Sequence, residues 1–261
     1  MTPRLALMGL RIDGMSNLRD LGGTPTADGG RIQPGRLWRS ENQTGLSAHS
    51  RRAMIASGLT DVVDLRTSYE CAASPSPFVD EPEVVYHQHS YFLEEIDAHA
   101  DVLQAAVPWL GGDDFGTQTT DDGANSYLLF LALRPDSVLA ALRAVAGASG
   151  AALVHCAVGR DRTGFTVALA LALVGAPDEA IAADYAETSR HLEGVLRALW
   201  SDEAYAIDED EASTMVIHTD EHTMLALLAC LHAQPGGVEG VLSRLGWTPS
   251  DQAALRAHLL S

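Results

Sequence analysis

Residues 151–164 read AALVHCAVGRDRTG, and this stretch decides the fold of the chain. Its apolar first half is typical of a buried strand, which we expect to end at His155-Cys156. Arg162-Thr163-Gly164 then open a long apolar stretch with the pattern of a buried helix. The sequence therefore predicts a strand, a tight loop and a helix in succession, with Cys156 at the start of the loop and Arg162 at its end.

This loop is suited to binding a phosphate dianion. Its backbone N–H groups can point inward at the N-terminus of a helix and form an anion nest, and a glycine in it tolerates the positive φ that a curled loop needs. The planar fork of Arg162 can bind two phosphate oxygens at once. The expected phosphate-binding residues are Ala157, Val158, Gly159, Arg160 and Thr163.

Cys156 is the expected nucleophile. The N–H groups and the helix dipole that would bind phosphate also favour a thiolate, and a thiolate beside a bound phosphate is in position to attack phosphorus. Thr163 could donate its hydroxyl hydrogen to the sulfur and ease its departure. A buried structural cysteine would also fit the end of a strand, but it would leave the positions of Gly159 and Arg162 unexplained.

The composition excludes several other classes of protein. The net charge is -18, from 17 basic and 35 acidic residues, which argues against a nucleic-acid partner. The three cysteines, Cys71, Cys156 and Cys230, are widely spaced, which argues against a disulfide framework and against zinc. We therefore expect no metal and no cofactor. No apolar run reaches the roughly 18 residues that a membrane-spanning helix needs.

The pattern of the chain predicts an α/β fold. Ser47 to Gly58 has a helical pattern that begins at a plausible Ser47 cap, and 59–65 and 84–89 read as strands. Tyr127 to Ala148 is helical with a break at Pro135, and nearly everything after Pro177 is helical. Strands and helices in alternation predict a central, mostly parallel sheet flanked by helices, with a helical C-terminal half.

Several motifs resemble those of the cysteine-dependent protein tyrosine phosphatases. The segment 155–164 is similar to the loop of the bacterial tyrosine/serine and dual-specificity branch, His-Cys-x-x-Gly-Lys-Asp-Arg-Thr-Gly. The segments NLRDLGG (17–23), GRLWRS (35–40), DVVDLRT (61–67) and GGVEGVL (236–242) resemble other motifs of that branch. The resemblance implies a tyrosine phosphatase-like fold in one domain over 1–261. It also implies that Arg160 stands where the branch has a lysine linked to phosphoinositide head groups.

The resemblance further implies which residue protonates the leaving group. In this branch the loop aspartate, here Asp161, is the favoured general acid. An alternative is Asp64, because a carboxylate at the C-terminal end of a strand faces the crevice where α/β sheets bind ligands. Asp161 could instead simply cap a helix, and Asp64 could form a salt bridge with a nearby arginine.

Residues 90–126 form the least regular segment, with acidic and glycine-rich runs between a few aromatic residues. Long insertions in enzymes are often lids, and helices near this position cover the active site in the relatives that the chain resembles. We expect a lid-like insertion over about 90–126.

These observations predict a protein tyrosine phosphatase, with possible dual specificity, that works through a phosphocysteine intermediate and releases inorganic phosphate. The substrate would be a phosphorylated protein. A phosphoinositide phosphatase is the first alternative, and a phosphate-binding module that has lost catalysis is the second. The free cysteines and the lack of a secretory signal predict a cytoplasmic protein, although the sequence leaves non-classical secretion open.

Overall fold

The computed structural model describes residues 12–94, 119–200 and 219–260. Its five strands form one sheet in the order β1-β2-β5-β3-β4. Only β1 runs antiparallel, against β2, and the other neighbours are parallel, so the expected mostly parallel sheet is confirmed. The strands are β1 (Arg19–Asp20), β2 (Leu37–Ser40), β3 (Leu59–Asp64), β4 (Val85–Gln88) and β5 (Ala151–His155).

Helices follow the strands along the chain, and the C-terminal half of the described chain is almost entirely helical. Ser47 accepts a hydrogen bond from the Ser50 N–H and caps the first helix, and Pro135 begins a new one, both as expected. The helices are α1 (Ala48–Ala56), α2 (Ser68–Ala73), α4 (Asp122–Leu133), α5 (Pro135–Gly147), α6 (Asp161–Leu173), α7 (Asp178–Glu187), α8 (Leu192–Trp200), α10 (Glu221–His232), α11 (Gly237–Leu245) and α12 (Pro249–Leu260), with a 3-10 turn at Thr188–Arg190.

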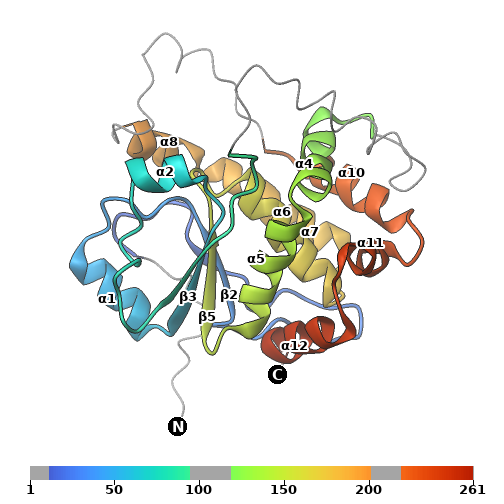
Figure 1. Cartoon of the computed structure of the whole chain (residues 1–261), viewed down its shortest axis with the longest axis horizontal. Helices are drawn as coiled ribbons and strands as arrows, with labels where there is room; N and C mark the ends of the chain where they lie inside the picture. The colour runs from blue at the N-terminus through green and yellow to red at the C-terminus, as the bar shows by residue number, and fades with distance from the viewer. Residues whose placement is uncertain (1–11, 95–118, 201–218, 261) are drawn as a thin grey trace.

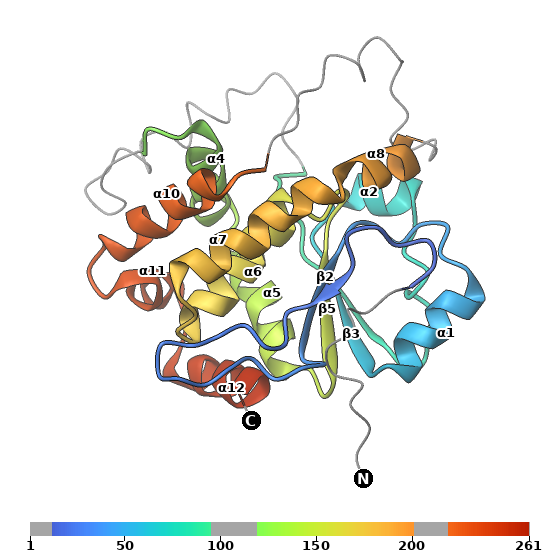
Figure 2. The same ribbon diagram turned by 180° about the vertical axis from the view of Figure 1, so that it is seen from behind.

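The sheet separates two hydrophobic cores of different size. Successive side chains of β5 point to opposite faces, so Ala152 and Val154 join the large core while Ala151 and Leu153 join the small one. The large core is closed by α4 to α7 and α10 to α12, which lie on one side of the sheet, and α1 packs on the other side (Figures 1 and 2). Because β5 is central and buried on both faces, the loop that follows it has a rigid base.

Helix α6 lies inside the molecule. Every residue from Arg162 to Leu171 is buried, and the helix packs against β2 and β5 as well as α4, α5, α7, α11 and α12. A helix that is apolar all round is stable only when other elements enclose it. Its N-terminus is therefore held at a fixed place above the sheet.

Three parallel strands end side by side at the edge that carries this loop. Ser40 of β2 and Asp64 of β3 both pair with His155 of β5. The carboxyl ends of parallel strands are where α/β folds place their ligands. The fold therefore brings the segments after β2, β3 and β5 together at one site.

Two further expectations concern segments that the structure covers only in part. The predicted lid at 90–126 falls largely outside the described residues, which omit 95–118, and the single domain over 1–261 stays a prediction. Within the described ranges, no single helix is long and apolar enough to cross a membrane, while the bent pair α10 and α11 meets that criterion by length and composition only.

Candidate active site

Cys156 lies at the point where the central strand ends and the loop that the sequence predicts to bind phosphate begins. It directly follows β5, and α6 begins five residues later at Asp161. Its side chain is buried, with 2% of its surface exposed. The Gly159 N–H donates to the Cys156 sulfur at 3.3 Å. A backbone N–H directed at sulfur stabilises a thiolate.

Three successive loop carbonyls, those of residues 157–159, accept hydrogen bonds from neighbouring segments. The Ala157 carbonyl accepts from the Asn42 N–H at 2.9 Å. The carbonyls of Val158 and Gly159 accept from Asn17 Nδ2 at 3.3 and 3.4 Å. In a planar trans peptide, the N–H lies opposite the carbonyl, so the N–H groups that follow these carbonyls face the inside of the loop. The geometry is that of an anion nest.

Gly159 has a φ of +74°, and its position admits no side chain. A Cβ atom there would lie 2.3 Å from the Ser40 carbonyl oxygen, where β2 ends. The glycine therefore does two things: it supplies the left-handed turn, and it lets the loop touch the backbone of the neighbouring strand.

A buried cluster of charged side chains holds the loop in place through its backbone. Arg39 on β2 donates from Nη2 to the Gly159 carbonyl at 2.7 Å and from Nη1 to Asp184 at 2.6 Å. Arg19 donates from Nε to the other Asp184 oxygen at 2.7 Å. Burial alone would raise the pKa of Asp184, but the two arginines hold it below its ordinary value. The cluster ties β1, β2 and α7 to the loop.

Arg162 is oriented by a carboxylate and an aromatic ring. It donates from Nη1 and Nη2 to the two carboxylate oxygens of Glu70 on α2, at 2.7 and 3.0 Å. Its guanidinium carbon lies 5.0 Å from the centre of the Phe92 ring, a cation–π distance. Although burial acts in the opposite direction, hydrogen bonds and charge from Arg162 keep the pKa of Glu70 low.

Asp161 is the first residue of α6, and its side chain is 38% exposed at the mouth of the loop. Arg160 Nε contacts both of its carboxylate oxygens, at 2.9 and 3.0 Å. The Tyr127 hydroxyl donates to its Oδ1 at 2.7 Å. The carboxylate is therefore partly accessible to solvent, and Tyr127 and Arg160 orient it. Arg160 is an ion-pair partner here, with a half-buried side chain.

Asp64, the alternative acid, has a different environment. Its side chain is fully buried and ion-paired with Arg66 Nη2 at 2.7 Å. The Tyr86 hydroxyl donates to the same carboxylate at 2.7 Å, and His155 Nε2 lies 3.4 Å away. Burial would raise the pKa of Asp64, but His155, Arg66 and Tyr86 hold it far below the ordinary range. The salt bridge that the sequence suggested is confirmed, and this geometry disfavours Asp64 as a proton donor.

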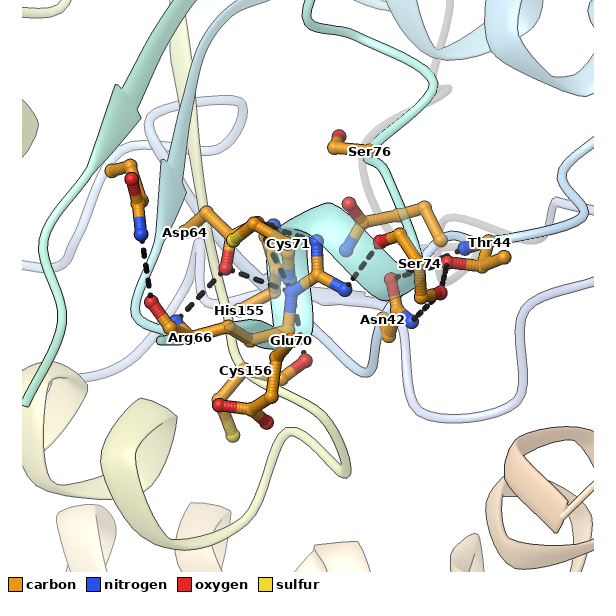
Figure 3. Close-up of polar contacts among 12 residues, drawn as sticks. Asn42, Thr44, Asp64, Arg66, Glu70, Cys71, Ser74, Ser76, His155 and Cys156 are labelled. Carbon is orange, nitrogen blue, oxygen red and sulfur yellow. Dashed lines mark hydrogen bonds and ion pairs between the residues drawn. The ribbon is translucent and has the colours of Figure 1, made fainter. Parts of the chain in front are cut away.

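Figure 3 shows this buried cluster next to Cys156. Asp64 sits between Arg66, His155 and Cys71, and Arg66 extends toward Ser74. Arg66 Nη1 donates to the Ser74 carbonyl at 2.8 Å, which links the end of β3 to the end of α2. The cluster fixes α2, and with it Glu70, relative to the loop.

His155 and Thr163 flank the nucleophile on either side in the sequence. His155 Nδ1 lies 3.3 Å from the Cys156 carbonyl oxygen, and its Nε2 lies 3.4 Å from the Asp64 carboxylate. Thr163 Oγ1 is buried and has no hydrogen-bond partner among the described residues. The expected bond from Thr163 to the sulfur is thus not formed in this structure, in which the Gly159 N–H contacts the sulfur instead.

A cavity of 440 Å³ opens beside the loop. Ala157 lines it on the loop side, and the segment after β2, the end of α2 and the apolar face of α8 form the other walls. The residues from these walls are Gly14, Glu41, Asn42, Thr44, Gly45, Ala73, Val195, Ala198 and Leu199. Within the described ranges, no group of three or more His, Cys, Asp or Glu side chains is placed to hold a metal ion.

Sequence reasoning identified the loop but missed most of its supports. Asp184, Tyr127 and Tyr185 carry no local motif, and they reach the loop only because α4 and α7 pack beside α6. Nothing along the sequence pairs Glu70 with Arg162, which lies 92 residues away. The sequence signals for these supports were the family-like segments 17–23, which contains Asn17 and Arg19, and 35–40, which contains Arg39.

The chain is similar to several known phosphatases. A family model described as "Tyrosine phosphatase family" matches residues 10–261. A provisionally named tyrosine-protein phosphatase of Cupriavidus necator is 31% identical over 185 residues, covering 69% of this chain and 63% of the relative. The triple specificity protein phosphatase PtpB of Mycobacterium tuberculosis is 31% identical over 200 residues, covering 67% of each.

Two further matches were found. A tyrosine-protein phosphatase of Nostoc commune is 30% identical over 225 residues, covering 82% of this chain and 70% of the relative. Among solved structures, a variant of P. aeruginosa TpbA in complex with pTyr is 17% identical, with a TM-score of 0.36, and the match covers 86% of this chain and 98% of that chain. The chain therefore spans 63% of the length of the Cupriavidus relative, which is less than two thirds. It spans 67% and 70% of the lengths of the Mycobacterium and Nostoc relatives.

Proposed function

The chain belongs to the tyrosine phosphatase family, and from this membership we propose that it hydrolyses phosphotyrosine in proteins through a phosphocysteine intermediate. The observation that carries the proposal is the loop itself. The loop carries the Cys156 sulfur, the Gly159 N–H that donates to it and Arg162, whose guanidinium is oriented by Glu70, and these are the groups that phosphate binding and attack on phosphorus would need.

In the first step, the Cys156 thiolate attacks phosphorus and a P–S bond forms. The bond between phosphorus and the leaving oxygen breaks, and Asp161 gives its proton to that oxygen. The loop N–H groups and Arg162 stabilise the three equatorial oxygens, where charge is concentrated in the transition state. The products of this step are a free tyrosine hydroxyl and phosphocysteine.

In the second step, water attacks the phosphocysteine. Asp161, now a carboxylate, accepts a proton from that water. The P–S bond breaks, and its electron pair returns to Cys156 as the thiolate. Inorganic phosphate leaves, and Asp161 is again protonated for the next cycle. The two steps consume one water molecule and return Cys156 and Asp161 to their starting states.

Asp161 rather than Asp64 is proposed as the acid because of where the two carboxylates lie. Asp161 is 38% exposed at the mouth of the loop, whereas Asp64 is fully buried and bound to Arg66. A general acid must be within hydrogen-bond reach of the leaving oxygen. Asp64, which is fully buried and paired with Arg66, cannot reach the leaving oxygen.

The test is a substrate panel measured with the wild type and with Cys156→Ser. We expect turnover of a phosphotyrosine peptide by the wild type and none by Cys156→Ser, which should still bind inorganic phosphate. Near-full activity of Cys156→Ser would overturn the mechanism. Because one relative is named a triple specificity phosphatase, the panel includes a phosphoserine peptide and phosphoinositide vesicles. A preference for the vesicles would replace the protein substrate with a lipid.

A further inference from the structure

Two tyrosines form a directed chain of hydrogen bonds that ends on the proposed acid. Tyr127 on α4 donates to Asp161 Oδ1 at 2.7 Å, and its oxygen lies 2.6 Å from that of Tyr185 on α7. A phenol has one hydrogen to donate. Because Tyr127 gives its hydrogen to the carboxylate, Tyr185 must be the donor in the second bond. The chain therefore runs from Tyr185 through Tyr127 to Asp161.

We propose that Tyr127, supported by Tyr185, is a positioning residue for proton transfer by Asp161. Its hydroxyl fixes the orientation of the carboxyl and occupies Oδ1, which leaves Oδ2 as the oxygen that carries the transferable proton. This inference rests on the proposed function, in which Asp161 is the general acid.

Tyr127 is held far more firmly than the other partner of the carboxylate. It is 4% exposed, and its ring packs against Phe130 and Phe165 at centroid distances of 6.0 and 6.3 Å. Arg160 lies on the loop, with 23% of its side chain exposed. Arg160 can therefore move when the acid takes up a proton, while Tyr127 remains in place.

Tyr185 is also held by its surroundings. Its ring meets Tyr127 edge to face, at 6.2 Å and 78°. A Cβ atom at Gly164 would lie 2.7 Å from the Tyr185 ring, so the glycine of the loop motif lets α7 approach α6. The motif thus contributes to the hydroxyl chain as well as to the anion nest.

Both hydroxyls keep their protons throughout the working pH range. Burial, and then the negative charge of Asp161, raise the pKa of Tyr127 far above its ordinary value. Burial raises the pKa of Tyr185 to about 12. The other charged groups facing this chain are Arg160 and Arg39, which act on Tyr185. Tyr127 therefore donates to Asp161 whether the carboxyl is ionised or neutral.

The central experiment is Tyr127→Phe, which keeps the ring and removes the hydroxyl. With phenyl phosphate, whose leaving group needs a proton, we expect kcat to fall about tenfold, as for one lost hydrogen bond to a charged group. With p-nitrophenyl phosphate, whose leaving group is stable as an anion, the loss should be much smaller. The alkaline limb of the pH profile should move to higher pH, because the ionised carboxylate has lost a donor.

Tyr91→Phe is the matched control. Tyr91 belongs to the same aromatic cluster, packing on Phe130 and Phe165, and its hydroxyl lies 2.7 Å from Thr166 Oγ1. The substitution removes a buried hydroxyl without touching Asp161. It should leave the ratio of the two substrates and the alkaline limb unchanged, so an equal change in both variants would overturn the inference.

Asp161→Asn separates failure of the inference from failure of the proposed function. It should lose far more activity on phenyl phosphate than on p-nitrophenyl phosphate, and adding Tyr127→Phe to it should cost nothing further. Equal losses on both substrates would overturn the acid assignment and the inference with it. If Asp161→Asn behaves as an acid variant and Tyr127→Phe behaves like Tyr91→Phe, only the inference fails.

A second variant covers the case in which Tyr127→Phe does not fold. Tyr185→Phe keeps the bond from Tyr127 to Asp161 but removes the donor behind it, and polarisation along such chains strengthens each bond. We expect the same upward shift of the alkaline limb, but smaller. An unchanged limb in Tyr185→Phe, with the wild-type substrate ratio, would contradict the proposal.

Discussion

Glu70 and Arg162 form a two-pronged ion pair across the candidate site, with Nη1 and Nη2 of the arginine 2.7 and 3.0 Å from the two carboxylate oxygens. Glu70 lies in the first turn of α2 and closes a capping box with Thr67, whose backbone and hydroxyl both donate to it. One carboxylate thus both begins a helix and orients the proposed phosphate-binding arginine. The plane of the guanidinium is set before any substrate arrives.

Glu70→Gln should therefore weaken catalysis without abolishing it. The amide keeps the size of the side chain but loses the charge, and its NH2 group cannot accept a hydrogen bond from the second guanidinium nitrogen of Arg162. A charge-assisted bond is worth roughly 1.5–3 kcal/mol, so kcat/KM should fall about 10- to 100-fold on a phosphotyrosine peptide. Glu94→Gln is the control, because Glu94 also accepts at α2, from the Ser68 N–H, and does not contact the loop. Equal effects of the two substitutions would contradict the orienting role.

Asp184→Asn should destabilise the fold by at least about 3 kcal/mol, measured by urea denaturation. The aspartate neutralises Arg39, which is fully buried, and Arg19. Removing one member of a buried ion cluster leaves a charge uncompensated, which typically costs 3–5 kcal/mol. Glu193→Gln, which breaks the exposed pair with Arg197 on α8, should change stability by less than about 0.5 kcal/mol. Similar losses of unfolding free energy in both variants would show that the buried cluster contributes no more to stability than an exposed ion pair.

Gly159→Ala should abolish phosphate binding, measured by calorimetry with inorganic phosphate. The added methyl group meets the Ser40 carbonyl at 2.3 Å, so the loop or β2 must move. Gly175→Ala separates this clash from backbone strain. Gly175 also has positive φ, at +86°, but a Cβ there has no neighbour within 4 Å. It should lose about 1 kcal/mol of stability and bind phosphate normally, and intact binding by Gly159→Ala would refute the close-contact argument.

The stability of the protein should fall as the pH is lowered from about 6.5 to 4. Burial lowers the pKa of His155 to about 4, although the nearby Asp64 acts in the opposite direction. Between these pH values His155 is protonated in the unfolded chain and neutral in the folded chain, so lowering the pH favours unfolding. His89, His191 and His258, whose pKa values are also lowered by burial, add to the effect.

His155→Asn isolates the contribution of that one histidine. The free energy of unfolding of this variant should vary less steeply across the window, by the equivalent of one proton and at most about 3 kcal/mol in total. Urea titrations at several pH values between 4 and 7 measure the difference. Identical slopes for the two proteins would mean that His155 takes up a proton as readily in the folded state as in the unfolded one.

The sequence by itself determined the parts of this protein that depend on neighbours along the chain. An apolar run, then Cys156, then Gly159 and Arg162 before a second apolar run predicts strand, loop and helix, because strand and helix periods and glycine conformations are local properties. Capping by Ser47 and the new helix at Pro135 were predicted for the same reason. The order of strands and helices then indicated a parallel sheet with the loop at its carboxyl edge.

Only the tertiary structure decided how the loop is supported and which side chains act together. Glu70 lies 92 residues from Arg162 in the sequence and Tyr127 lies 34 from Asp161, and no pattern along the chain encodes such distances. The family resemblance favoured Asp161 over Asp64 as the acid, but the residues alone left both open, because each is an aspartate beside a motif. Asp64 is buried at the end of β3 and pairs with Arg66, whereas Asp161 is partly exposed as the first residue of α6, directly after the loop. Packing, rather than residue type, sets the environment that determines what a carboxylate can do.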